Sequence, residues 1–136
     1  AYYNNTLIGN CDFSIQGGSV DAAFISITNF SIVPNNGNLT GEEYNIWAGD
    51  NVTKLGETIA QSEGYITSTN ANVNADGIYY TDMGEATYLS AFGDSGGPVY
   101  LTDSKKVIGI HKGSTAFTSI FVKVDNIASK LNAHFN

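Results

Sequence analysis

One segment of this chain has the residues that nucleophilic catalysis by serine requires. Residues 93–98 read Gly-Asp-Ser-Gly-Gly-Pro. A serine hydroxyl is a weak nucleophile, so it needs a base to accept its proton and N–H donors to hold the developing oxyanion. Flanking glycines let the backbone turn sharply, so that the amides of Gly93 and Ser95 can point at one oxygen. The segment predicts Ser95 as a nucleophile with Gly93 and Ser95 as oxyanion donors. The alternative is a glycine-rich turn with an incidental serine.

Asp94 lies inside this segment and is expected to fix the turn. A carboxylate in such a turn is held by a buried ion pair or by hydrogen bonds from the backbone. The chain contains no arginine, so the cation that would pair with Asp94 cannot be named from the sequence.

The elements around this segment are predicted to be β-strands. Short apolar runs alternate with Gly, Asn and Asp turns, a pattern typical of antiparallel β-structure. Strands are expected over residues 22–28, 64–69, 77–80, 98–101, 107–111 and 119–124, with tight turns at 35–37, 75–77 and 103–105. The sequence therefore predicts an all-β protein.

One helix is expected at the C-terminal end. Val124, Ile127, Leu131 and Phe135 recur on one face at helical spacing. Asp125 is placed to cap the first turn.

Composition excludes several classes of partner. Of the 136 residues, 6 are lysine and 13 are acidic, which gives a net charge of −7. Nucleic acids and anionic membranes require clustered cations, so neither is an expected partner. The apolar fraction of 42% is sufficient for a core, but no run approaches the length of a membrane span.

Several features favour a secreted protein. Asn-X-Ser/Thr sequons occur at Asn4, Asn29, Asn38 and Asn51, and the chain starts at Ala1 as a processed product would. Cys11 is the single cysteine, so it is either a buried thiol or a bridge to another chain. We expect an extracellular glycoprotein.

From Gly17 onward the chain resembles the chymotrypsin-like serine proteases, and within them the streptogrisin-like branch. The segments that carry the resemblance follow in the family's order: Asp-Ala-Ala-Phe-Ile at 21–25, the strand-turn-strand of 52–58 and 64–68, Asn-Ala-Asn-Val-Asn at 70–74, the serine segment, and Val-Ile-Gly-Ile-His at 107–111. The resemblance implies a chymotrypsin-like antiparallel β-barrel fold. Residues 1–34 would hold the last strands of a partial N-terminal barrel, and residues 35–136 a complete C-terminal barrel, with Pro34 at the boundary.

The resemblance also implies a function. The chain would be a serine endopeptidase that acts on protein or peptide substrates through an acyl-enzyme on Ser95, with no metal and no organic cofactor. Asp21 would be the aspartate of the catalytic triad, although an aspartate before an apolar strand is commonly just a turn residue. Lys112 departs from the family, in which a serine supports that aspartate.

The substrate pocket is expected around His111. Glutamyl endopeptidases of the family carry a histidine at this place, where its imidazole helps to bind the acidic side chain. Ser90 and Ser114 could add donors. Leu89 provides no acid at the expected pocket base, so a preference for Arg or Lys is not expected. The alternative is that His111 is a strand residue whose nitrogens are satisfied within the protein.

The histidine that should act as the base is missing. No histidine precedes Asp21, His111 is expected in the pocket wall, and His134 is expected on the surface. We favour a companion chain that carries the histidine and completes a cleaved, two-chain enzyme, since the chain begins abruptly inside what should be the first barrel. The alternatives are a catalytically inactive binding or structural module on the same scaffold, and an unusual base within this chain.

Overall fold

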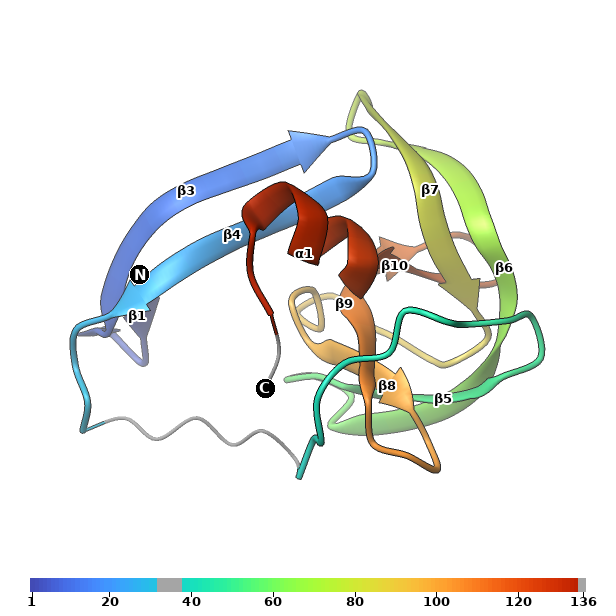
Figure 1. Cartoon of the computed structure of the whole chain (residues 1–136), viewed down its shortest axis with the longest axis horizontal. Coiled ribbons are helices and arrows are strands. Elements are labelled where there is room, and N and C mark those ends of the chain that lie inside the picture. The colour runs from blue at the N-terminus through green and yellow to red at the C-terminus, as the bar shows by residue number, and fades with distance from the viewer. Residues whose placement is uncertain (32–37, 135–136) are drawn as a thin grey trace.

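The computed structural model describes residues 1–31 and 38–134 (Figure 1). In chain order its elements are β1 (Tyr2–Tyr3), β2 (Thr6–Leu7), β3 (Gly9–Gly17), β4 (Val20–Ile27), β5 (Asn51–Leu55), β6 (Gln61–Ala75), β7 (Ile78–Ala86), β8 (Pro98–Leu101), β9 (Val107–Ser114), β10 (Ser119–Lys123) and the helix α1 (Val124–Leu131). The protein is all-β with a C-terminal helix, as predicted.

Six strands form a closed antiparallel barrel. Their order around the barrel is β10-β7-β6-β5-β8-β9. Closure gives every strand of the barrel a neighbour on both sides along at least part of its length. Its interior is apolar, and the buried side chains include Val52, Ile66, Val99, Ile108 and Phe121.

Two of the tight turns predicted inside the barrel are present. Asp76 and Gly77 both have positive φ (52° and 78°) in the turn between β6 and β7. Two successive positive φ values are typical of a two-residue hairpin, which is why Asp-Gly was informative. Lys105 has a φ of 63° in the turn between β8 and β9. The third predicted turn, at 35–37, and Pro34 lie outside the described residues.

The strands β3 and β4 form a hairpin outside the barrel. The hairpin arches over α1 and meets the barrel at its turn (Figure 1). There the amide of Gly18 donates to the carbonyl of Tyr79 at 3.2 Å, and the amide of Thr81 donates to the carbonyl of Gly18 at 2.8 Å. Val20 is buried at this end. The division into units 1–34 and 35–136 remains a prediction.

The helix α1 covers one end of the barrel through an apolar stripe. Val124, Ile127, Ala128 and Leu131 are buried. The helix ends at Leu131 because Asn132 adopts a left-handed conformation (φ 50°), which terminates helices. Phe135 lies outside the described residues. In the described part of the chain α1 is the only helix, and it is neither long nor apolar enough to cross a membrane.

The predicted cap of this helix is wrong. The N-cap is Lys123, which makes no side-chain capping bond, and Asp125 lies one step inside the first turn. Its carboxylate accepts the amide of Asn126 at 2.8 Å. A carboxylate in the first turn still interacts favourably with the positive end of the helix dipole.

Predicted and observed strands agree best where turns bound them. One strand, β8, has the predicted bounds. Four strands are longer than predicted: β4, β6, β7 and β9. The strand β10 is one residue shorter than predicted because Val124 begins α1. β3 was missed, although Cys11, Phe13 and Ile15 alternate with polar residues, which is the pattern of a strand. Cys11 is exposed, so its interpretation as a buried thiol is wrong.

Candidate active site

The serine segment is held from inside by the carboxylate of Asp94. Lys54 on β5 donates from Nζ to Asp94 Oδ2 at 2.6 Å, and both side chains are fully buried. Backbone amides supply the remaining hydrogen bonds: Thr58 and Ile59 donate to Oδ1 at 2.8 and 3.0 Å, and Ala91 donates to Oδ2 at 3.0 Å. The carboxylate therefore ties the serine segment to β5 and to the loop that follows it.

These donors determine the charge of Asp94. Burial acts to raise the pKa of the carboxyl, but the Lys54 ammonium and the three amides outweigh it and hold the pKa well below its usual range. Asp94 is thus ionised at neutral pH. Lys54 is the cation that the sequence could not name; its place in an apolar strand, between Thr53 and Leu55, was the available signal.

Ser95 lies at the surface, with its oxyanion donors beside it. Its hydroxyl donates to the backbone carbonyl of Lys112 at 2.8 Å. Gly93 has a φ of 102°, a conformation that glycine adopts without strain. Among the described residues neither the Gly93 amide nor the Ser95 amide donates to a protein group, so both could donate to an incoming oxygen.

Asp21 is bound to Lys112 rather than to Ser95. The Lys112 ammonium donates to Asp21 Oδ2 and lies over the ring of Tyr80, 4.2 Å from its centroid. Burial acts to lower the pKa of Lys112, but hydrogen bonds with Asp21 and Tyr80 outweigh it, so the pKa is raised. Lys112 is therefore a cation at neutral pH. Lys112 thus contacts Asp21 through its side chain and Ser95 through its backbone carbonyl.

His111 is buried, with one ring nitrogen satisfied by a tyrosine. Its side chain is 2% exposed, and Nδ1 lies 2.9 Å from the hydroxyl of Tyr88. Its backbone pairs with the serine segment, since Gly96 donates to its carbonyl and its own amide donates to the carbonyl of Gly97, both at 2.8 Å. Burial lowers the pKa of His111 to about 4, and the charge of Lys54 adds to the shift while Asp94 opposes it. The ring is neutral at pH 7.

Three serines lie close to this histidine. The hydroxyls of Ser90 and Ser119 are 2.9 Å apart, and Ser119 also donates to the carbonyl of Tyr88 at 2.8 Å. Ser114 is the register partner of Ser119 across β9 and β10. Of the predicted pocket residues, Ser90 is hydrogen-bonded to Ser119, and Ser114 lies opposite Ser119 on the neighbouring strand. Sequence reasoning missed Ser119 and Tyr88, and no local motif pointed to either.

Leu89 and His134 lie away from these groups. The side chain of Leu89 is 71% exposed, so it does not form a pocket base. His134 is on the surface, as predicted, where Nδ1 lies 2.9 Å from Glu42 Oε1. Both histidines of the chain are therefore occupied away from Ser95 and Asp21.

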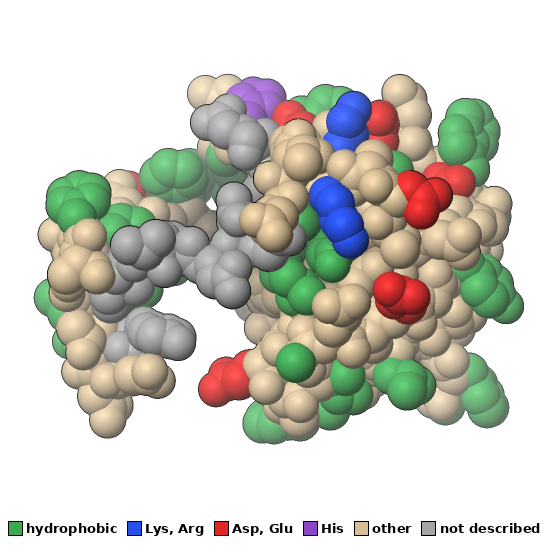
Figure 2. Space-filling model, turned by 90° about the horizontal axis from the view of Figure 1, so that it is seen from below, with side chains coloured by type: hydrophobic (Ala, Val, Ile, Leu, Met, Phe, Trp, Pro, Cys, Tyr) green, Lys and Arg blue, Asp and Glu red, His purple; other side chains and the backbone are tan. Residues whose placement is uncertain are grey.

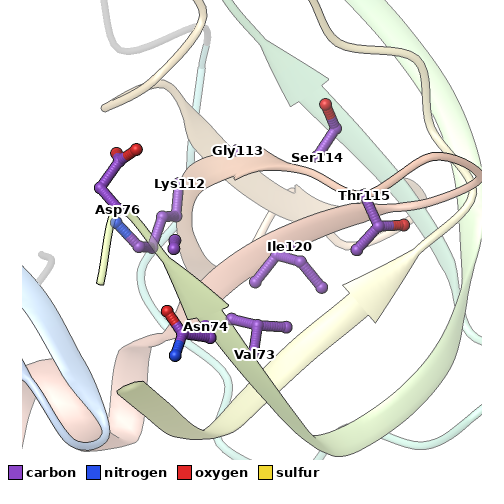
Figure 3. A pocket seen from close by; sticks show the side chains of 9 residues that line it. Val73, Asn74, Asp76, Lys112, Gly113, Ser114, Thr115 and Ile120 are labelled. Carbon is purple, nitrogen blue, oxygen red and sulfur yellow. The ribbon is translucent and has the colours of Figure 1, made fainter. Parts of the chain in front are cut away.

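One cleft lies at the serine and a second lies at the end of β9, next to Lys112. One, of about 300 Å³, is lined by the serine segment and by Leu55, Gly56 and Glu57. The other, of about 510 Å³, lies between the β6–β7 turn and the end of β9 (Figure 3). Its labelled residues include Asn74 and Asp76 from β6 and the turn that follows it, and Lys112, Gly113 and Ser114 from β9. Among the described residues no cluster of His, Cys, Asp and Glu could hold a metal ion.

Known proteins are similar to this chain in sequence and in fold. Residues 26–131 match the model of the trypsin family. Glutamyl endopeptidase 2 of Streptomyces griseus is 39% identical over 72 residues, which are 52% of this chain and 37% of that protein. The chain thus spans little more than a third of the length of this curated relative.

Solved structures share the fold. A glutamic-acid-specific serine protease described as using a histidine triad in substrate binding superposes with a TM-score of 0.80 at 22% identity, over 95% of this chain and 74% of that one. A Nocardiopsis protease gives 0.78 at 20% identity, over 91% and 71%. The chain belongs to the trypsin family of chymotrypsin-like serine proteases.

Proposed function

We propose that this chain is the nucleophile-bearing part of a serine endopeptidase. Ser95 Oγ would attack the carbonyl carbon of a peptide bond as a base accepts its proton. The amides of Gly93 and Ser95 would hold the oxyanion. The C–N bond then breaks, the amine leaves with the proton, and water hydrolyses the acyl-enzyme on Ser95. The observation that carries this proposal is the Asp94 network, which presents a serine hydroxyl and two unused amides at one cleft.

The base must come from outside these 136 residues. Lys112 contacts Ser95 through its carbonyl and Asp21 through its ammonium, but that ammonium is already protonated and cannot accept a proton. Histidine is the usual base for serine, but neither His111 nor His134 forms a side-chain hydrogen bond with Ser95 or Asp21. We infer that a companion chain supplies a histidine that reaches both Ser95 and Asp21.

The β3–β4 hairpin supports the existence of such a partner. Two strands alone rarely form a stable sheet in water. The hairpin nonetheless exposes large apolar side chains: Phe13, Phe24, Ile25 and Ile27 are each 39–44% exposed. The rings of Phe13 and Phe24 stack at 5.5 Å. Hydrophobic side chains are visible on this part of the surface (Figure 2). A partner that packs on the hairpin would bury them.

The end of β9 provides a place for an extended peptide. β8 pairs with β9 as far as Ile110, and beyond His111 the described strands give β9 no neighbour on that side. A peptide could add there as a strand, with its scissile bond at Ser95. The cleft of Figure 3 would receive side chains on one side of that bond, and the cleft at Glu57 those on the other.

We further propose that the enzyme cleaves after glutamate. His111, Ser90 and Ser114 offer hydrogen-bond donors to a carboxylate, and none of these three side chains is an acid that would bind Arg or Lys. The similarity to a glutamyl endopeptidase supports this choice. A histidine triad is not available within this chain, since it has two histidines and His134 is remote.

A secreted glycoprotein remains our expectation for this enzyme. The sequon residues Asn4, Asn38 and Asn51 are exposed, as attachment of a glycan requires.

The second candidate is a non-catalytic peptide-binding module. It is favoured by one contact: the Lys112 ammonium occupies an oxygen of Asp21, the carboxylate that a catalytic histidine would need. Such a module would still bind a peptide along β9.

The test uses native protein, purified without dissociating any bound polypeptide. A fluorophosphonate probe should label Ser95, identified by mass spectrometry of the modified peptide, and Ser95→Ala should abolish labelling. A histidine-containing polypeptide should co-purify, and its removal should suppress labelling. If intact material with its partner is not labelled, the non-catalytic module is the better description.

A further inference from the structure

Tyr88 connects three polar side chains of the proposed pocket, those of His111, Ser119 and Ser90. Its hydroxyl meets His111 Nδ1 at 2.9 Å. Its carbonyl accepts the hydroxyl of Ser119 at 2.8 Å, and Ser119 meets Ser90 at 2.9 Å. Tyr88 is thus hydrogen-bonded through both its side chain and its backbone. These bonds hold the His111 imidazole on one side and the two serines on the other. Its side chain is 2% exposed, so water cannot replace either contact.

The hydroxyl of Tyr88 decides which nitrogen of His111 carries the hydrogen. A phenol has one hydrogen to donate, and a buried donor needs an acceptor. In the described part of the chain, His111 Nδ1 is the one partner of this hydroxyl. Burial also raises the pKa of Tyr88, so the phenol keeps its hydrogen. The hydroxyl must therefore donate to Nδ1, which leaves the hydrogen of the neutral ring on Nε2.

Nε2 is then a donor without a protein acceptor. No hydrogen-bond partner for Nε2 occurs among the described residues, although the histidine as a whole is 98% removed from solvent. Every fully buried side-chain nitrogen or oxygen of those residues has a partner, so Nε2 must retain some exposure to solvent. A neutral ring with an unused N–H at the surface is suited to an acceptor from a ligand.

We propose that Tyr88 is a positioning residue for substrate specificity, which holds His111 as the Nε2–H form so that Nε2 donates to the side-chain carboxylate of a substrate glutamate. This rests on the proposed function and adds to it the group that orients the pocket histidine.

The charges around His111 agree with a neutral donor. Lys54 and Asp94 face it from β5 and from the serine segment, and they compensate each other through their ion pair. The register partner of His111 on β10 is Phe121, which is apolar and fully buried. The pocket histidine therefore has no carboxylate of its own to satisfy Nε2.

The first experiment observes the tautomer directly. The chain is labelled with ¹⁵N at histidine, and two-bond nitrogen–proton correlations at pH 7 identify the protonated nitrogen of each ring. We expect His111 with its hydrogen on Nε2 and His134 with a hydrogen on Nδ1, where it can donate to Glu42, so His134 serves as the internal control. A wild-type His111 that carries its hydrogen on Nδ1 would overturn the proposal, whether or not Ser95 is reactive.

The second experiment tests Tyr88 and the ligand. Tyr88→Phe keeps the ring and removes the hydroxyl, so it should change His111 to a tautomer mixture. Tyr100→Phe, at another buried tyrosine, should leave His111 unchanged. N-Acetylglutamate should shift the His111 Nε2 resonance of the wild type, and N-acetylglutamine at the same concentration should not. In the active assembly, Tyr88→Phe should lower kcat/KM for glutamate substrates roughly tenfold, the effect of one hydrogen bond to a charged group.

These outcomes separate the two proposals. If Ser95 is not labelled but the tautomer and the glutamate shift are observed, the endopeptidase function fails and Tyr88 still organises an acid-binding pocket. If Ser95 is labelled but Tyr88→Phe leaves the tautomer and the glutamate preference unchanged, the role of Tyr88 is refuted and the endopeptidase stands.

Discussion

The buried pair Lys54–Asp94 gives the sharpest stability prediction. Both side chains are fully buried, and the Nζ–Oδ2 distance is 2.6 Å. Lys54→Met removes the cation and preserves the length of the side chain. It leaves a carboxylate that is buried and charged, which costs about 3–5 kcal/mol when one partner of a buried pair is removed. Because three backbone amides still donate to Asp94, we expect the lower end, about 3 kcal/mol.

Asp94→Asn should cost more, about 4 kcal/mol, although it is nearly isosteric. The amide oxygen can keep the donors on the Oδ1 side, from Thr58 and Ile59. The amide nitrogen, however, would face two other donors, the Ala91 amide and the Lys54 ammonium. A buried ammonium without its counterion adds to the loss. The double variant should lose less than the sum of the two, by at least about 1 kcal/mol, since the residues interact directly.

The assay is urea unfolding followed by far-UV circular dichroism. The matched control is Lys106→Met, whose partner Glu43 is 3.8 Å away on the surface. Surface pairs contribute about 0–1 kcal/mol, so this control should lose little. A Lys54→Met variant that loses under about 1 kcal/mol, no more than the control, would refute the idea that this pair fixes the serine segment.

The pH dependence of this pair follows from the lowered pKa of Asp94. A group whose pKa is depressed by folding adds stability that is complete above its unfolded pKa, about 3.9 for aspartate. That stability is lost as the pH falls toward the folded pKa. The free energy of unfolding should therefore decline below about pH 4 in the wild type. This part of the decline should be absent in the double variant.

The remaining predictions concern Lys112 and two glycines. Lys112→Met should lower the free energy of unfolding by about 1 kcal/mol at pH 7, since Asp21 is partly exposed. Because folding raises the pKa of Lys112, its contribution to that free energy is present below the unfolded pKa of lysine and is lost as the pH rises through the folded pKa. The urea unfolding curves of wild type and variant should therefore converge at alkaline pH. Gly84→Ala should cost about 3 kcal/mol or more, because a Cβ there would lie 2.1 Å from the ring of Phe121. Gly113→Ala should be near neutral in thermal unfolding, since a Cβ there meets nothing within 4 Å; an equal loss in both glycine variants would contradict this packing argument.

The fold could be predicted well because its signals are local. Strand ends are marked by turns such as Asp76-Gly77, and the apolar face of α1 recurs at helical spacing. The errors arose where tertiary contacts set the ends. β6 continues to Ala75 because β7 pairs with it along its length, and no residue inside β6 marks that extension. β10 ends one residue before its predicted end because Val124 is the first residue of α1.

The site was predictable only in part, since its residues are joined by contacts that cross the barrel. Ser95 and Asp94 could be named from one segment, but Lys54 is 40 positions away from Asp94. Tyr88 and His111 are 23 positions apart. Such pairs form because neighbouring strands bring them together, and a single sequence contains no pattern that links them. Burial also decides their chemistry: the pKa of His111 falls because of the closed barrel around it, which composition cannot show.

If a companion chain supplies the histidine, as proposed above, Lys112 would decide how that histidine reaches Asp21 and Ser95. Its ammonium binds Oδ2 of Asp21, while Oδ1 has no partner among the described residues. Its carbonyl holds the Ser95 hydroxyl at 2.8 Å. A histidine that enters from a companion chain could donate to Oδ1 without displacing the lysine. It would then compete with the carbonyl for the serine hydroxyl, which needs only to rotate about its Cα–Cβ bond. The lysine cation would also lower the pKa of that histidine, so the assembled enzyme should keep its base unprotonated to a lower pH than an enzyme with a neutral residue here.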